Sequence, residues 1–196
     1  MVDFFKFFRK TAGPSILIAT LNARLQPMHR DDIEDVFNTA TEKRGYGARV
    51  VGGGTAFAPD GEIEECDLEI EVDELSEASI GIVTGLLESM LAPKGSRLTI
   101  PGRDDPVIFG THEGLAIYLN GTDLAPDVYK VCDVNHVVEE CERLLEGDGH
   151  IASHWEGPVE TALYIYGKSF AAMRERLLPF LKSYPLCEGC RLEQIA

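Results

Sequence analysis

The chain of 196 residues lacks long apolar runs, an excess of basic residues and a dense set of cysteines. No stretch approaches the roughly 20 apolar residues of a membrane-spanning helix, so no span is expected. With 18 Lys and Arg against 33 Asp and Glu, the formal net charge is −15, which disfavours nucleic acid as a partner. An odd number of cysteines does not suggest a disulfide framework, so most should be reduced thiols. The five are Cys66, Cys132, Cys141, Cys187 and Cys190.

Signatures of catalysis are also missing. The glycines at 52–54 are not followed by the Lys-Ser/Thr pair of a phosphate-binding loop, and they are expected to mark a β-bulge or a close backbone approach. No Gly-x-Ser-x-Gly elbow occurs, and no cysteine lies in a nucleophile signature. An enzyme would need a cleft that joins carboxylates and histidines from both halves of the chain. Its candidate histidines are His112, His136, His150 and His154.

Hydrophobic residues make up 44% of the chain, so a globular protein with a buried core is expected despite the charge. Residues 1–10, MVDFFKFFRK, form an aromatic and basic extension without the apolar stretch of a signal peptide. A cytoplasmic location is therefore expected. The extension either packs on the body of the protein or makes a weak contact with a membrane surface.

The order of landmarks in the first half of the chain returns in the second half, which indicates an internal duplication. We expect one unit at 11–105 and a second at 110–196, with a Pro-, Gly- and Asp-rich linker around 101–114. The matching landmarks are Leu21-Asn22 with Leu119-Asn120, Asp32-Ile33 with Asp133-Val134, Leu68 and Ile70 with Leu163 and Ile165, and Arg97-Leu98 with Arg191-Leu192.

Hydrophobic periodicity gives both halves the same order of strand, helix, two strands, helix and strand. The first half should have a strand at 15–21, a helix capped by Asp31 or Asp32, a hairpin turning at 59–61, a helix at 79–91 and a strand at 96–100. The second should have a strand at 114–120, a helix at 133–146, a hairpin at 150–166, a helix at 169–184, which Pro179 should kink or restart, and a strand at 190–195. This order predicts an α+β fold of two tandem ferredoxin-like βαββαβ units, each an antiparallel sheet with helices on one face.

The acidic residues concentrate between Val50 and Pro93, where no Lys or Arg occurs. Side chains of a strand alternate between its faces, so Cys66, Leu68, Ile70 and Val72 should share one face, and Asp67, Glu69, Glu71 and Asp73 the other. If the apolar set meets the helices, the open face carries a ladder of carboxylates. The ladder is either a solvated face that prevents edge-to-edge aggregation or a docking surface for a basic protein.

Tyrosines replace these carboxylates in the second half, where Tyr164 and Tyr166 align with Glu69 and Glu71 and Tyr118 is expected on the same side. Tyrosines on an open sheet suit recognition of a protein partner. Alternatively this face packs against the other unit, or against a second copy of the chain in a homodimer. In RNA-binding versions of the fold exposed aromatics stack bases, but the basic residues that hold phosphates are missing here.

A zinc site is a further alternative. Cys187 and Cys190 form a CxxC pair, and two Cys with two His suit tetrahedral zinc. His150 and His154 would lie more than about 13 Å apart along an extended strand, so only one of them can join such a site. Cys187, Cys190 and His150, completed by Cys132 or His136, are the candidate ligands; otherwise no cofactor is expected.

The sequence thus favours a non-enzymatic binding or regulatory protein that engages a basic protein partner, in the manner of an immunity or antitoxin protein. One alternative is a small-molecule sensor that holds its ligand between the two units. The other is the zinc-binding protein described above. The predicted partner surface consists of Asp67, Glu69, Glu71, Asp73, Tyr118, Tyr164 and Tyr166.

Overall fold

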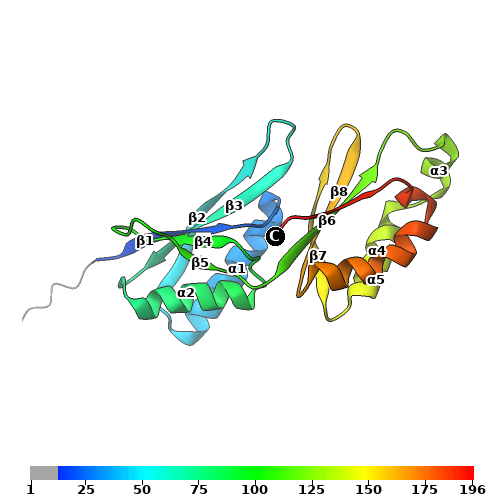
Figure 1. The fold of residues 1–196 in the computed structure, drawn as a ribbon. Coiled ribbons are helices and arrows are strands. Elements are labelled where there is room, and N and C mark those ends of the chain that lie inside the picture. The colour runs from blue at the N-terminus through cyan, green and yellow to red at the C-terminus, as the bar shows by residue number, and fades with distance from the viewer. Residues whose placement is uncertain (1–12) are drawn as a thin grey trace, which may run out of the picture.

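The computed structural model describes residues 13–196, so the predicted extension at 1–10 lies outside them. Two parts follow one another along the chain, each an antiparallel sheet with helices on one face (Figure 1). We call the part with the first sheet unit 1 and the part with the second sheet unit 2. The predicted α+β fold of two tandem ferredoxin-like units is confirmed.

Unit 1 has the strand order β2-β3-β1-β4-β5. Its elements are β1 (Ser15–Leu21), α1 (Pro27–Arg44), β2 (Ala48–Phe57), β3 (Ile63–Val72), α2 (Glu77–Ser89), β4 (Ser96–Thr99) and β5 (Val107–Phe109). The first four strands have the ferredoxin-like order, and β5 adds an edge strand within the segment predicted to be a linker. A strand of three residues is too short to show a period in the sequence.

Unit 2 has the strand order β7-β8-β6-β9, which matches the order of the first four strands of unit 1. Its elements are β6 (Glu113–Asn120), α3 (Pro126–Val131), α4 (Val134–Leu145), β7 (Gly149–Glu156), β8 (Glu160–Gly167), α5 (Phe170–Ser183), the 3₁₀ turn η1 (Pro185–Cys187) and β9 (Arg191–Gln194). The short helix α3 is absent from the sequence prediction. It starts at Pro126, because proline is well suited to the first turn of a helix.

Two helix predictions need correction. α1 begins at Pro27, with Gln26 as its N-cap, and not after Asp31 or Asp32. Proline at the first helical position loses no hydrogen bond, so the helix starts earlier than the acidic residues suggest. α5 runs as one helix from Phe170 to Ser183 with Pro179 inside it, so the predicted restart does not occur, while the alternative of a kink at Pro179 stays a prediction.

The two sheets share one register, as a duplication requires. Ile18 lies opposite Glu69 in unit 1, and Ala116 lies opposite Tyr164 in unit 2. A β-bulge also interrupts both hairpins at the same place, after Val50 in β2 and after Ile151 in β7. A shared irregularity of this kind is stronger evidence for a repeat than a shared strand order, because bulges are specific local features.

The hydrophobic core divides into two clusters. One fills the space between the sheet of unit 2 and its helices α4 and α5. The other fills the space between the sheet of unit 1 and its helices, and it also includes Tyr118, Tyr164 and Tyr166 of unit 2. The second sheet is therefore covered on both sides, by its own helices and by unit 1 (Figure 1). Within residues 13–196 no helix is both long and apolar enough to cross a bilayer.

Candidate functional site

Strand β3 places Asp67, Glu69 and Glu71 on the side of the sheet away from α1 and α2, and the fourth predicted carboxylate, Asp73, follows directly after the strand. Cys66, Leu68, Ile70 and Val72 are buried in the core. Asp67 and Glu71 are half-buried, whereas Glu69 and Asp73 are exposed. We call this side the open face of unit 1. By strand register it comprises Ile16, Ile18 and Thr20 on β1, Gly52 and Gly54 on β2, Glu65, Asp67, Glu69 and Glu71 on β3, Arg97 and Thr99 on β4, and Ile108 on β5.

Only some of these carboxylates have a basic partner. Glu71 accepts hydrogen bonds from Arg49 at 2.8 and 3.0 Å, and Glu65 pairs with Arg97 through two bonds of 2.9 and 3.0 Å. Hydrogen bonding to Glu65, with the charge of Asp67 nearby, raises the pKa of Arg97. Among the residues described, Glu69 and Asp67 take part in no ion pair, and the buried Oδ1 of Asp67 has no hydrogen-bond partner.

The neighbours of Glu69 leave its carboxylate accessible. At Gly52 a Cβ atom would come within 3.1 Å of the Glu69 carboxylate. The glycine therefore leaves the space beside this carboxylate free of a side chain. Gly53, on the helix side, allows β2 to approach the backbone of β3 closely, since a Cβ there would lie 2.4 Å from the carbonyl oxygen of Asp67. On the other side of the carboxylates, Ile16 is 37% exposed and Ile108 is 65% exposed. The face therefore combines negative charge with exposed aliphatic surface.

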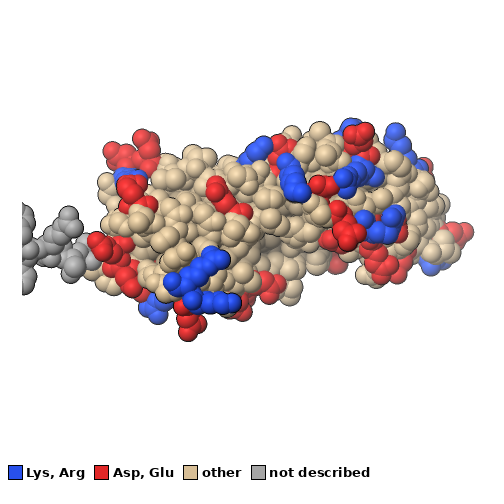
Figure 2. All heavy atoms as spheres, turned by 90° about the horizontal axis from the view of Figure 1, so that it is seen from below, with Lys and Arg blue, Asp and Glu red and all other residues tan. Residues whose placement is uncertain are grey.

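The opposite side of the molecule differs in its charge pattern. Seen from below, toward the helices of unit 1, acidic and basic side chains lie among each other over unit 2, and much of the surface of unit 1 is uncharged (Figure 2). On the open face, by contrast, Glu65 and Glu71 are paired with Arg97 and Arg49, whereas Asp67 and Glu69 between them take part in no ion pair among the described residues.

The tyrosines of unit 2 are placed differently from the carboxylates that they replace. Tyr118, Tyr164 and Tyr166 are all at least 96% buried, against unit 1. The hydroxyls of Tyr118 and Tyr164 donate to one oxygen of Glu62 at 2.6 and 2.9 Å. This arrangement corresponds to the alternative in which the aromatic face packs against the other unit.

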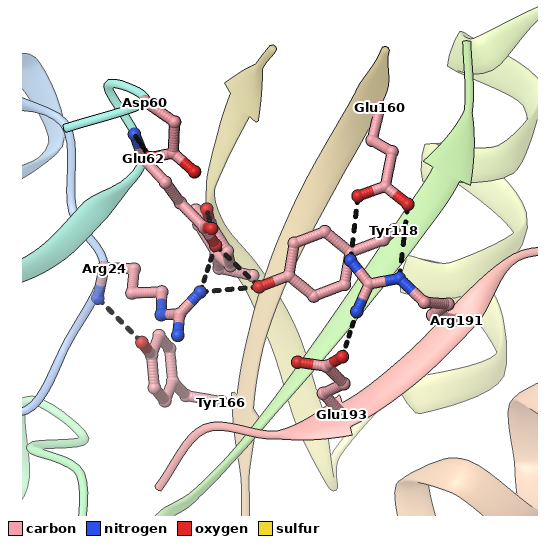
Figure 3. A network of polar contacts seen from close by, with 9 residues as sticks. Arg24, Asp60, Glu62, Tyr118, Glu160, Tyr166, Arg191 and Glu193 are labelled. Carbon is pink, nitrogen blue, oxygen red and sulfur yellow. Dashed lines mark hydrogen bonds and ion pairs between the residues drawn. The ribbon is translucent and has the colours of Figure 1, made fainter. Parts of the chain in front are cut away.

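Arg24 completes the contact between the units. Its guanidinium pairs with Glu62 and donates to the hydroxyl of Tyr118 at 2.6 Å, while its backbone N–H donates to the hydroxyl of Tyr166 at 2.8 Å (Figure 3). Burial, with the hydrogen bond to Glu62, raises the pKa of Tyr118 to about 12. Burial raises the pKa values of Tyr164 and Tyr166 as well. All three hydroxyls therefore stay protonated near neutral pH and hold the units together as neutral groups.

An ion pair that the sequence did not reveal occurs at the same place in both units. Arg97 pairs with Glu65 in unit 1, and Arg191 pairs with Glu160 in unit 2, through bonds of 2.8 and 3.2 Å. The guanidinium of Arg191 also lies 4.2 Å from the centre of the Tyr118 ring (Figure 3). The alignment of Arg97-Leu98 with Arg191-Leu192 was the available signal, but the carboxylate partners depend on the sheet register.

The candidate cysteines Cys132, Cys187 and Cys190 share one core cluster, but the candidate ligand His150 does not join them. Cys187 and Cys190 belong to the core on the helix side of the second sheet. His150 lies opposite Tyr166 on β7, and it lines a cavity on the other side of the sheet. No group of three or more potential metal ligands occurs in the part of the chain that the structure describes. Burial raises the pKa of the Cys187 thiol to about 12, so it remains protonated.

Comparison with known proteins gives no family for this chain. No protein-family model and no curated protein matches it. Solved structures of similar extent include an unknown protein from Galdieria sulphuraria, with 14% identity over 92% of this chain and 97% of that chain and a TM-score of 0.29. A Fusobacterium nucleatum protein proposed to be a monooxygenase has 11% identity over 93% and 91% of the two chains and a TM-score of 0.31. The first two RRM domains of yeast poly(U)-binding protein have 9% identity over 92% and 99%, with a TM-score of 0.24. At these values the likenesses carry no argument about function.

Proposed function

We propose that the protein binds a basic protein partner through the open face of unit 1. The observation that carries the proposal is that two equivalent sheet faces differ in their side chains and in what packs against them. In unit 2 the face carries tyrosines and is covered by unit 1, whereas in unit 1 it carries carboxylates, and Glu69, Ile16 and Ile108 on it are exposed. A duplicated face that keeps charged residues accessible is available for a second molecule.

The chemistry of the face defines the partner. Glu69 is exposed and lacks a basic partner among the described residues, so a cationic side chain of another protein can supply one. The exposed aliphatic groups of Ile16 and Ile108 favour a partner that also presents apolar side chains. An amphipathic segment with a lysine- or arginine-rich side meets both requirements, and the negative field of the chain would speed its approach.

A concrete form of this function is neutralisation of a cationic protein, as an immunity or antitoxin protein does. Complementary charge across an interface raises the association rate and suppresses wrong partners, which suits tight control of one target. A cytoplasmic location fits the proposal, because all five cysteines are free thiols.

The test uses a defined probe, a helical peptide with a lysine side and a leucine side. Its affinity is measured by calorimetric titration for the wild type, for Glu69→Lys/Glu71→Lys and for a control, Glu139→Lys/Glu175→Lys. The control makes the same change in net charge on exposed positions of α4 and α5. We expect the first variant to bind at least about tenfold more weakly, because like charges then face each other, and the control to retain most of the affinity.

Equal affinities of the wild type and Glu69→Lys/Glu71→Lys would refute the proposal. An equal loss in both variants would also refute it, because net charge alone would then explain the binding. Sedimentation of the wild type without peptide provides a further check. Self-association that only the open-face variant abolishes would assign this face to a second copy of the chain instead of a basic partner.

A further inference from the structure

Four of the five histidines of the chain line the cleft between the two units. His112 and His150 line one cavity, and His29, His150 and His154 line a second one beside it. These residues come from segments far apart in the sequence: α1, the segment before β6, and β7. The cleft therefore gathers titratable groups that the docking face of unit 1 does not use.

The first cavity has a volume of about 220 Å³ and carries the stronger basic character. Besides the two histidines it is lined by Lys168, whose ammonium group donates to the carbonyl oxygen of Gly147 at 2.8 Å. Burial, with the nearby charges of His150 and Lys168, lowers the pKa of His112. Three basic residues thus line one small space in a chain with a net charge of −15.

One carboxylate also lines this cavity, and its charge is compensated. Asp148 pairs with Arg176, and one of its oxygens lies 3.5 Å from the Lys168 ammonium. Close to His112, Lys94 is paired with Glu113 at 2.6 Å. Glu113 is balanced by Lys94, and Asp148 lies near two cations, Arg176 and Lys168. Each carboxylate at the cavity is therefore compensated by at least one positive charge.

The wall of the cavity contains a strained residue. Leu91 has a φ of 69° and is the only non-glycine residue with positive φ among those described. Helices commonly end with a glycine in this left-handed conformation, because a side chain there costs free energy. Here a leucine is kept, and its side chain lines the cavity together with Tyr166. Strain held at a cavity wall is typical of binding sites.

We propose that this cavity binds a small oxyanion, a carboxylate or phosphate group, through Lys168, His112 and His150. The ammonium group and the imidazole N–H groups are the donors that such an anion requires. Leu91 and Tyr166 would contact the apolar part of the ligand. Because unit 1 contributes Leu91 and unit 2 contributes Lys168, an occupied site would link the two units, as the sensor alternative requires.

The test titrates the full chain with inorganic phosphate and, separately, with malonate, at constant ionic strength and one fixed pH. Calorimetry gives the affinity, and the ring resonances of the histidines report where the anion binds. Each probe is raised to about 10 mM, enough to fill most of a site with a millimolar Kd. We expect saturable binding of at least one probe, with shifts at His112 and His150. The probe that binds more tightly identifies the group as phosphate or carboxylate.

Matched variants distinguish binding in this cavity from nonspecific electrostatic attraction of the anion to the protein. His112→Asn and Lys168→Ala should each weaken binding about tenfold, since each removes a hydrogen bond to a charged group. Lys182→Ala removes the same charge at the end of α5 and should bind as the wild type does. Leu91→Gly relieves the backbone strain, so its Tm should not fall, and a loss of affinity in this variant cannot result from unfolding.

Absence of saturation with both probes would overturn the proposal. Wild-type affinity in both His112→Asn and Lys168→Ala would overturn it as well. None of these results depends on the open face of unit 1, because neither Lys168 nor His112 belongs to that face.

Discussion

The two units present the same side of the same sheet to different surroundings. In unit 1 the position of Glu69 is exposed, next to a glycine on β2. In unit 2 the equivalent residue, Tyr164, is fully buried against unit 1 and bonded to Glu62. The backbone register is the same in both units, so the two faces differ in their side chains and in what packs against them.

This difference teaches how a repeat can acquire two roles. Tyrosine suits the contact between units because its ring fills space while its hydroxyl finds a partner when buried. A carboxylate at the same position would need a base inside the contact, because an unpaired buried charge is very costly. Arg24 already pairs with Glu62 there, so the junction has no spare cation for another carboxylate. The acidic version of the face is stable only where it remains open.

The largest expected effect comes from removing the equivalent side chains. Tyr164→Ala should lower the free energy of unfolding by about 3–5 kcal/mol, as other buried aromatic truncations do. Glu69→Ala should change it by no more than about 0.5 kcal/mol, since the residue is exposed. Urea unfolding of both variants checks the comparison. If Tyr164→Ala does not fold, Tyr164→Phe, which keeps the ring and loses the hydroxyl with its bond to Glu62, should cost about 1 kcal/mol. Similar costs at Tyr164 and Glu69 would show that the tyrosine face is not covered in solution.

The fold could be predicted from the sequence because its evidence is local. Alternating residues such as Cys66 to Val72 define β3, and the repeat gives each assignment twice. The predictions that were wrong or incomplete also concern short local segments. β5 is three residues long, and α1 starts at a proline four residues before the acidic cap candidates. Short elements and helix starts at proline carry little periodic signal.

The candidate site could be predicted only in part. The alternation on β3 separates the carboxylates from the core without any knowledge of tertiary structure. Which sheet face stays open depends on how the units pack, and no periodicity contains that information. The Glu62 network and the histidine cleft likewise join residues far apart in the chain, such as Arg24 with Tyr118. A CxxC pair gives a strong local signal, yet the structure places Cys187 away from His150.

The second test uses pH to distinguish the covered face from the open one. The folded pKa of Tyr118, about 12, lies above its unfolded value of about 10. The native state therefore holds the proton that the unfolded state loses, so stability should be intact below pH 10 and fall between pH 10 and 12. Absorbance of tyrosinate should show that Tyr118, Tyr164 and Tyr166 ionise at a higher pH in the native protein than in urea. In Tyr118→Phe the fall in stability should be shallower. Ionisation of all six tyrosines at the ordinary value would contradict the buried network.

The smallest expected effect compares the two equivalent arginines. Arg97 and Arg191 form matching ion pairs that are partly exposed, and such pairs contribute between about 0.2 and 1 kcal/mol. Arg191 also lies over the Tyr118 ring, which adds about 0.5–1 kcal/mol for a cation near an aromatic face. Arg191→Ala should therefore cost more than Arg97→Ala by about that amount in urea unfolding. In a Tyr118→Leu background, which removes the ring, the two costs should become equal. A difference that persists in that background would place the advantage of Arg191 in its contact with Glu193, which has no counterpart among the ion pairs of Arg97 within residues 13–196.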